Sequence, residues 1–319
     1  MPDRSALRPF GKTGLEVSAL CIGTSSWGTE RSGESAAQRD ARIGSLADFA
    51  LSAGSPVNCL DTSNIYGGSR SEGYIGQALA RAGGVPAGYV IHTKLDRRLS
   101  DNAFTEEQMW RSLEESRERL GLERIQVLFL HDPEVIGFER ATAPGGPMAA
   151  LLEMKERGLA DAIGISGGPV DMLRRFVATG HFDALITHNR FTLVDRSADE
   201  LLSEAHERGL GINNAAPYGA GALHTGGDPL RYGYGPAHPE VSAAVLAMRR
   251  VCAEAGVDIG AAALQFSLRE PRISSTVVGI SSLERLDRTL MDATADIPEG
   301  LWAELDELAP SRASALDAR

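Results

Sequence analysis

The chain has 319 residues, of which 43% are hydrophobic, and its net charge is −11. This acidity would repel nucleic acid and anionic lipid, and no run approaches the ~18 apolar residues that a membrane span needs, so neither partner is expected. The length suits one large domain, which we expect to span 1–319.

The three cysteines lie inside apolar runs and lack CxxC spacing: Cys21, Cys59 and Cys252. This pattern is typical of small buried hydrophobic side chains and not of a disulfide framework. The N-terminus also lacks the apolar core of a signal peptide. Together these features predict a reducing, cytoplasmic location.

The chain opens with two short segments within 7–17, joined by Lys12-Thr13-Gly14, that predict a hairpin. Apolar runs of strand length then alternate eight times with helical patterns. The runs are continuously apolar, which is typical of parallel strands buried on both faces. The predicted strands are Ala19–Gly23, Val57–Asp61, Tyr89–Lys94, Ile125–His131, Ala160–Ile165, Ala184–Thr187, Gly211–Asn214 and Ser275–Gly279.

Each predicted strand is followed by a helix, and the third helix begins with a capping box formed by Thr105 and Gln108. The predicted helices are Gln38–Ala53, Ser71–Arg81, Thr105–Leu120, Pro147–Arg157, Val170–Ala178, Ala198–Arg208, Pro239–Ala255 and Leu283–Met291, with an extra C-terminal helix at Glu299–Leu308.

Eight strand–helix pairs predict an α/β protein with a (β/α)8 TIM barrel. A doubly wound sheet is the alternative, although no GxGxxG motif follows the first strand. The long glycine-rich segment 217–238 contains three tyrosines, which favours a lid loop over a spacer. We expect 311–319 to be a loose tail.

Three successive predicted strands end on ionisable residues: Asp61, Lys94 and His131. Tyr66 follows the first of these strands in a loop. The carboxyl ends of barrel strands face one mouth, so we expect the four side chains to converge there. A single strand-end Asp is usually a cap and a single strand-end Lys is usually solvated, but their coincidence on neighbouring strands favours a site.

The residue types at this site favour proton transfer. No Ser or Cys stands beside a base in the sequence, and one His with one carboxylate is too few for a metal site. A charged Lys94 would stabilise phenolate and lower the pKa of Tyr66, making it a proton donor or acceptor while His131 orients a substrate oxygen. A hydride would then come from a nicotinamide or flavin. A Schiff-base aldolase acting through Lys94 is an alternative, although a nearby Asp opposes amine nucleophilicity.

Together with several other segments, these residues resemble the aldo-keto reductase superfamily. The resemblance rests on these segments: 10–18 (FGKTGLEVS), 61–67 (DTSNIYG), Thr93-Lys94, Leu130-His131, Gly164-Ile165-Ser166, Ala216-Pro217-Tyr218-Gly219 and 278–286. It implies a (β/α)8 barrel whose bottom is plugged by the hairpin 7–17. It also implies an NAD(P)-dependent carbonyl reductase or alcohol dehydrogenase without a metal. Tyr66 would be the general acid/base, tuned by Lys94 and Asp61, and His131 would polarise the substrate oxygen.

The resemblance also implies a set of cofactor contacts. They are Gly23, Thr24, Ser25, Ser166, Asn189, Asn214, Ala216, Pro217, Tyr218, Gly219, Gly279, Ser281 and Arg285. The chain departs from the family where an asparagine is replaced by Gly167, a glutamine by Leu185 and a stacking aromatic by Ala215. Asn189, Asn213 and Asn214 are candidates for the missing hydrogen bonds.

Cofactor choice stays open between NADP and NAD. Arg285 matches a family arginine that meets the 2′-phosphate, at a helix N-terminus suited to anions. The lysine that often assists it is replaced by Gly279.

Two stretches, 189–195 and 214–221, resemble the branch of D-threo-aldose and L-fucose dehydrogenases. The resemblance implies oxidation of an aldose at C1. A polyhydroxyl substrate needs polar groups around it, and Trp27, Tyr218 and His224 are candidates for such a pocket. A general aldehyde, ketone or pyridoxal-type enzyme is an alternative, and so is a nicotinamide-binding regulatory subunit like the potassium-channel β subunits. We expect a monomer or small homo-oligomer.

Overall fold

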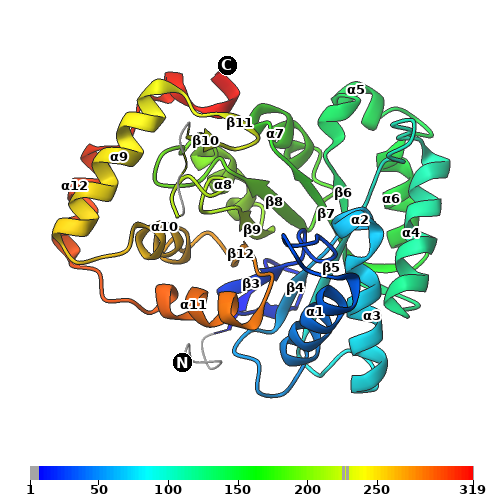
Figure 1. Ribbon diagram of the computed structural model, residues 1–319. Coiled ribbons are helices and arrows are strands. Elements are labelled where there is room, and N and C mark those ends of the chain that lie inside the picture. Colours follow the sequence, from blue (N-terminus) through cyan, green and yellow to red (C-terminus); the bar gives the residue numbers. More distant parts are fainter. Residues whose placement is uncertain (1–6, 225–226, 228–229, 319) are drawn as a thin grey trace.

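In the computed structural model, which describes residues 7–224, 227 and 230–318, eight parallel strands close into a barrel (Figure 1). The strand order around it is β12-β3-β4-β5-β6-β7-β8-β9, which confirms the predicted (β/α)8 barrel and excludes the doubly wound sheet. The strands are β3 (Leu20–Gly23), β4 (Cys59–Asp61), β5 (Val90–Leu95), β6 (Ile125–His131), β7 (Ala160–Gly167), β8 (Ala184–His188), β9 (Gly211–Ala215) and β12 (Ser275–Gly279).

Helices surround the barrel, and their packing separates two apolar cores. The larger core lies between strands and helices, and the smaller one fills the barrel, where inward and outward side chains alternate along each strand. The main helices are α1 (Ala36–Ala50), α3 (Ser71–Ala82), α4 (Glu106–Leu120), α6 (Pro147–Glu156), α7 (Val170–Ala178), α8 (Asp199–Glu207), α9 (Pro239–Glu254), α10 (Ile259–Leu268), α11 (Leu283–Ala293) and α12 (Glu299–Glu307).

Helix α10 was missed because its sequence carries no amphipathic period. Seven of its ten residues are buried, so the segment is apolar on nearly every side. Its start signal was nevertheless present, since the Asp258 side chain accepts a hydrogen bond from Gly260 N.

The predicted capping box of α4 forms only in part. The Thr105 hydroxyl accepts from Gln108 N at 3.3 Å, but the Gln108 amide donates to the carbonyl of Asp96 instead of returning to the cap. The full reciprocal box occurs at α1, between Ser35 and Gln38.

The predicted hairpin is present as β1 (Arg8–Pro9) paired antiparallel with β2 (Glu16–Val17). Between them, Phe10 is fully buried and stacks on the ring of His92 inside the barrel, with the ring centroids 5.0 Å apart. Gly211 allows this insertion, because a Cβ at that position would lie 2.6 Å from the Phe10 ring. Burying a Phe side chain contributes roughly 1.5–3 kcal/mol, so the hairpin is firmly seated.

The segment 217–238 is partly anchored. It contains the short hairpin β10 (Arg231–Tyr232) and β11 (Gly235–Pro236), and the buried Tyr232 hydroxyl donates to Asn189 O at 2.7 Å. Tyr234, at the hairpin turn, is 77% exposed. Residues 225–226 and 228–229 of the predicted lid lie outside the described residues, as does Arg319.

The expectation of a loose C-terminal tail is wrong for 311–318. Two 3-10 turns, Arg312–Ser314 and Leu316–Ala318, dock this segment on the barrel. Asp317 accepts from the Arg190 guanidinium at 2.7 Å and from Val170 N at 2.8 Å. An ion pair with a nearly buried arginine, which composition did not reveal, fixes the end of the chain.

No single helix among the described residues is long and apolar enough to cross a membrane. In the described part of the chain, one bent pair of helices, α9 and α10 across a 102° bend, meets the criteria of length and composition when taken together.

Candidate active site

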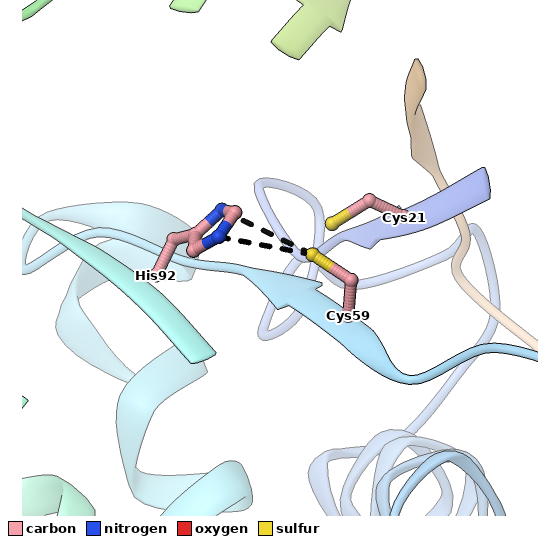
Figure 2. Close-up of side chains that lie close together, drawn as sticks. All are labelled: Cys21, Cys59 and His92. Atoms are coloured by element: carbon pink, nitrogen blue, oxygen red, sulfur yellow. Dashed lines mark hydrogen bonds between the residues drawn. The ribbon is translucent and has the colours of Figure 1, made fainter. Parts of the chain in front are cut away.

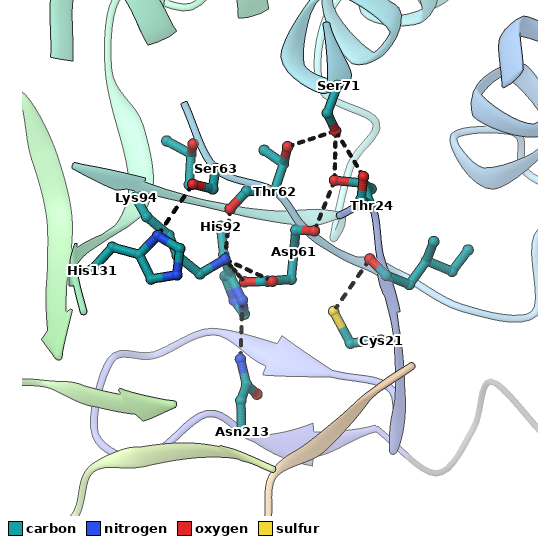
Figure 3. Close-up of polar contacts among 12 residues, drawn as sticks. Cys21, Thr24, Asp61, Thr62, Ser63, Ser71, His92, Lys94, His131 and Asn213 are labelled. Carbon is teal, nitrogen blue, oxygen red and sulfur yellow. Dashed lines mark hydrogen bonds and ion pairs between the residues drawn. The ribbon is translucent and has the colours of Figure 1, made fainter. Parts of the chain in front are cut away.

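The first pair of the predicted quartet forms a tight ion pair at neighbouring strand ends. Lys94 Nζ lies 2.8 and 2.7 Å from the two carboxylate oxygens of Asp61 and 2.7 Å from the carbonyl oxygen of Thr62 (Figure 3). Both side chains are nearly inaccessible to solvent. An ammonium group has three protons, and all three are committed to these acceptors.

Tyr66 is placed over this pair by an unusually close backbone contact. A Cβ on Gly67 would lie 1.4 Å from the carbonyl oxygen of Trp27, and Gly67 has a φ of +61°. Only glycine permits this approach and this conformation. As a result, Lys94 Nζ lies 4.6 Å from the centroid of the Tyr66 ring, and the His131 ring meets it edge-on at 5.8 Å.

The expected lowering of the phenol pKa by Lys94 is wrong for this structure. Burial, followed by the charges of Asp61 and Asp96, raises the pKa of Tyr66 well above its usual value. The lysine cannot offset this because its charge is already neutralised by Asp61. Tyr66 is therefore protonated at neutral pH and is poised as a proton donor.

His131 is held by Asp96, a residue that the sequence reading missed. His131 Nδ1 lies 2.6 Å from Asp96 Oδ1, and the other carboxylate oxygen accepts from the hydroxyl of Ser63. Burial alone would lower the pKa of His131, but the charges of Asp96 and Asp132 outweigh it and raise that pKa. A signal was available in the sequence, because Asp96 is a carboxylate that lies two residues beyond Lys94, directly after the end of β5.

Three of the predicted contact residues are buried and form hydrogen bonds within the protein. The Thr24 hydroxyl is fully buried and donates to the carbonyl of Asp61, and it also contacts the Ser71 hydroxyl (Figure 3). Trp27 is fully buried, with its indole N–H donating to Ile280 O at 2.7 Å. Asn214 is turned toward α10, where its amide donates to Ser267 and Phe191 O. Because these side chains are inaccessible, the structure does not support the contacts predicted for them, although the side-chain oxygen of Asn214, like that of Asn189, has no hydrogen-bond partner among the described residues.

His224, which was predicted to line the substrate pocket, contacts Arg285 in the structure. Its Nε2 accepts from Arg285 at 2.7 Å, and its ring lies 5.3 Å from that of Tyr218. Burial and then the charge of Arg285 lower the pKa of His224, which keeps it neutral. His224 therefore contacts Arg285 and Tyr218, two residues of the predicted cofactor site.

The remaining predicted contacts line the same edge of the barrel. Ala216, Pro217, Tyr218 and Gly219 form the turn after β9, and the guanidinium of Arg285 lies 5.1 Å from the Tyr218 ring centroid. Gly279 is exposed and a Cβ there would meet open space. Ser281 accepts from Arg31 just before α11, Gly23 ends β3, and Ser25 follows it exposed in the loop.

The positions at which this chain differs from the family pattern lie in different surroundings. Leu185 is fully buried in the outer core, so this position does not face the mouth. Ser166 and Gly167 end β7, Ala215 ends β9, and Asn189 follows β8 with only 1% of its surface exposed. The side-chain oxygen of Asn189 is buried without a hydrogen-bond partner among the described residues. Asn213 faces the interior instead, 3.1 Å from His92 Nδ1.

Two groups with metal-ligating chemistry, neither foreseen, occur among the described residues. One is Asp132, Glu134 and His188 at the mouth, and the other is Cys21, Cys59 and His92 inside the barrel (Figure 2). Cys59 Sγ lies 3.9 Å from His92 Nε2, so a cysteine does stand beside a base. Burial would raise the pKa of Cys59, but Cys21 and His92 outweigh it and lower that pKa to about 6. All three residues are fully buried, which removes them from any substrate.

Comparisons with known proteins agree with this geometry. The model of the aldo/keto reductase family matches residues 19–310. L-galactose dehydrogenase of Arabidopsis thaliana is 32% identical over 291 residues, 90% of this chain and 88% of that protein. D-threo-aldose 1-dehydrogenase of a Pseudomonas species is 36% identical over 64% of this chain and 62% of that protein.

Pyridoxal 4-dehydrogenase of Microbacterium luteolum is 26% identical over 94% of this chain and 96% of that protein. Among solved structures, the holo form of an aldo-keto reductase from Bacillus halodurans superimposes with a TM-score of 0.76 at 18% identity, covering 98% of this chain and 99% of that chain, which supports the fold. The chain therefore belongs to the aldo/keto reductase family and is an NAD(P)-dependent oxidoreductase.

Proposed function

We propose that the protein oxidises an aldose-type sugar at C1, with Tyr66 as general acid/base. The observation that carries this proposal is the placement of Tyr66 between the Lys94–Asp61 ion pair and His131. A bound nicotinamide would supply the hydride acceptor in oxidation and the hydride donor in reduction. The residues described here would handle the proton and the orientation of the reacting oxygen.

Tyr66 and His131 would act on the same substrate oxygen. In reduction, Tyr66 donates its proton to the carbonyl oxygen, and its raised pKa keeps that proton available. In oxidation, the phenolate form accepts the hydroxyl proton, so oxidation is favoured as pH rises. The ion pair beneath the ring fixes the phenol without competing for the substrate, because Lys94 is fully occupied.

The state of His131 would follow the direction of the reaction. Asp96 binds Nδ1, and Nε2 lies 3.7 Å from Asp132 Oδ1, outside hydrogen-bond distance. When protonated, His131 donates from Nε2 to a carbonyl oxygen; when neutral with its proton on Nδ1, it accepts from a substrate hydroxyl. Because the pKa of His131 is raised, the donor form extends to higher pH than in an ordinary histidine.

The residues at the mouth fit a nicotinamide cofactor. The buried, unpartnered oxygen of Asn189 suits a carboxamide N–H, and Ala215 leaves the adjacent strand end uncrowded. The guanidinium of Arg285 donates to His224 Nε2, and a Cβ at Gly279 would meet open space. We infer that Arg285 meets the 2′-phosphate of NADP, while the missing lysine at 279 leaves NAD acceptable.

The aldose assignment rests on relatives and on the site. The chain is 32% identical to an L-galactose dehydrogenase over 291 residues and 36% identical to a D-threo-aldose 1-dehydrogenase over 208 residues. A pyridoxal-type substrate is the second candidate, since a pyridoxal dehydrogenase matches nearly the whole chain at 26% identity. The carboxylates at the mouth favour a substrate with several hydroxyl donors.

The aldolase alternative is disfavoured by the three hydrogen bonds of Lys94. Schiff-base formation needs an amine nitrogen with a free lone pair, whereas Lys94 Nζ is enclosed by three oxygen acceptors. A regulatory subunit that binds cofactor without turnover would keep the same geometry, so kinetics must separate it from an enzyme.

The test is Tyr66→Phe, compared with Tyr74→Phe, which removes a phenol hydroxyl on the outer helix α3. Loss of the general acid/base should lower kcat by about 10²–10⁴-fold, with cofactor binding unchanged when followed by nicotinamide fluorescence. Tyr74→Phe should retain turnover. Full turnover in Tyr66→Phe would refute the assignment, and tight cofactor binding without turnover in the wild type would favour the regulatory subunit.

A further inference from the structure

A second set of polar residues, which we name the acceptor cluster, lies beside the proposed reaction centre. It consists of Asp132, Glu134 and His188, which follow or end β6 and β8. Ligand atoms of the three all lie within 4.8 Å of one another. Asp132 Oδ1 is 3.7 Å from His131 Nε2, the ring nitrogen that Asp96 does not contact.

The acceptor cluster contains two buried carboxylate oxygens that lack a hydrogen-bond partner among the described residues. They are Asp132 Oδ1 and Glu134 Oε2. The neighbouring Asn189 is 1% exposed, and its amide nitrogen lies 3.2 Å from His188 Nδ1, which holds the ring of His188 in place. Buried acceptors are rarely left unpaired in native proteins, and two at one mouth indicate that a ligand supplies the donors.

The sequence makes specific room for one of these carboxylates. A Cβ on Gly167 would lie 2.9 Å from Glu134 Oε2, so a larger residue at 167 would displace the carboxylate. The other oxygen of Glu134 accepts from Gly168 N at 3.1 Å, which fixes its orientation. Gly167 stands where the family has an asparagine, and the absence of a side chain at this position leaves room for the carboxylate of Glu134.

His188 and Tyr234 complete the surroundings. Burial lowers the pKa of His188 to about 4, so the ring is neutral. Because the Asn189 amide donates to Nδ1, the proton of His188 is on Nε2, where it is a donor and not a metal ligand. The exposed ring of Tyr234 meets the His188 ring edge-on at 5.7 Å, providing an apolar surface above the cluster.

We propose that the acceptor cluster binds the hydroxyl groups next to the reacting carbon and thereby selects polyhydroxylated substrates over simple aldehydes. The proposal rests on the proposed function and identifies the residues that bind the substrate hydroxyls. Vicinal hydroxyl oxygens lie about one hydrogen-bond length apart, so a hydroxyl beside an oxygen held at His131 Nε2 reaches Asp132. Glu134 then receives the next hydroxyl. A substrate without these donors leaves the buried carboxylates unpaired.

A divalent cation is the competing occupant, since two carboxylates and a histidine are metal ligands. The donor tautomer of His188 favours hydroxyls, which both donate and accept. A cation would also place a double positive charge beside His131, opposing the protonation that Asp96 and Asp132 favour.

The test compares kcat/KM for propanal, 2-hydroxypropanal and glyceraldehyde in the wild type, Asp132→Asn, Glu134→Gln and Asp161→Asn. Asp161 is a matched control, because it pairs with Arg124 at the opposite end of the barrel. Asp132→Asn should reduce the preference for 2-hydroxypropanal over propanal by about tenfold or more, and Glu134→Gln should do the same for glyceraldehyde over 2-hydroxypropanal. Asp161→Asn should keep both ratios at the wild-type value.

Unchanged ratios in both variants, with all three aldehydes still reduced, would overturn the acceptor cluster but leave the proposed function intact. A wild type that reduces none of the three aldehydes and oxidises no aldose would overturn both. A rise in melting temperature with Mn²⁺ in the wild type that is lost in Glu134→Gln would identify a cation site and also overturn the proposal.

Discussion

Replacing Asp96 by Asn isolates the effect of the buried charge that holds His131. The change keeps the size of the side chain but removes the carboxylate that lies 2.6 Å from His131 Nδ1. Burial, which is the largest influence on this histidine and lowers its pKa, would then act with less opposition. The protonated form of His131 should therefore disappear at a lower pH than in the wild type.

The magnitude follows from the kind of bond that is lost. A hydrogen bond to a charged group contributes about 1.5–3 kcal/mol, which corresponds to about ten- to a hundredfold in an equilibrium constant. Both groups are almost fully buried, so solvent screens this bond very little. Aldehyde reduction near neutral pH should fall by about that factor, and less below the ordinary pKa of histidine, about 6.5.

The same substitution should change the free energy of unfolding in a way that depends on pH. A histidine whose folded pKa is raised stabilises the fold fully below its unfolded pKa, and this contribution is lost as pH rises through the folded value. Asp96→Asn should therefore lower the free energy of unfolding most at acid pH. The difference from the wild type should narrow as the pH rises.

The assay is kcat/KM for reduction of one aldehyde from about pH 5 to about pH 9, with Asp101→Asn as a control. Asp101 is half exposed and pairs with Arg98 in the same loop, so its loss should leave the profile unchanged. Superimposable profiles for Asp96→Asn and the wild type would refute the role assigned to the Asp96–His131 pair.

Two further predictions concern the chain end and the cofactor. Asp317→Asn leaves the nearly buried Arg190 without its ion pair and should lower the free energy of unfolding by about 1–3 kcal/mol in denaturant melts. Asp306→Asn removes a more exposed ion pair and should leave the free energy of unfolding nearly unchanged. Equal stability of the two variants would contradict the docking of the C-terminal segment. Arg285→Gln should raise KM for NADP by about tenfold while KM for NAD changes little, and equal effects on both cofactors would remove Arg285 from the 2′-phosphate site.

The sequence predicted the barrel well because its signals were local and repeated. Continuous apolar strands, the alternation with helices and the strand-end positions of Asp61, Lys94 and His131 each depend on a few neighbouring residues. Parallel strands in a closed barrel then bring their carboxyl ends to one mouth, whatever the details of the loops.

The predictions that differ from the structure concern residues whose position depends on packing against distant parts of the chain. Trp27 looked like a pocket residue, but its burial follows from the contact of its backbone with Gly67, 40 residues away in the chain. His224 was assigned to the substrate because its loop could not be placed against Arg285. The tail looked loose because the pairing of Asp317 with Arg190 crosses 127 positions.

The pKa of Tyr66 shows a different kind of error. The presence of Lys94 nearby was predicted correctly, but its effect depended on how its charge was already used. Asp61 neutralises the lysine, so burial dominates and the phenol stays protonated. Residue types indicated a proton-transfer site, whereas the resting protonation state needed the distances.

The central claim is hydride transfer between an aldose and a nicotinamide at Tyr66. It is tested most directly by following the absorbance of reduced nicotinamide when the wild type and Tyr66→Phe are mixed with NAD or NADP and a series of aldoses. The account predicts growth of this band with an aldose in the wild type and its loss in Tyr66→Phe, and the growth should become faster at higher pH because the pKa of Tyr66 is raised. Absence of growth with every aldose, or equal growth in the variant, would contradict it.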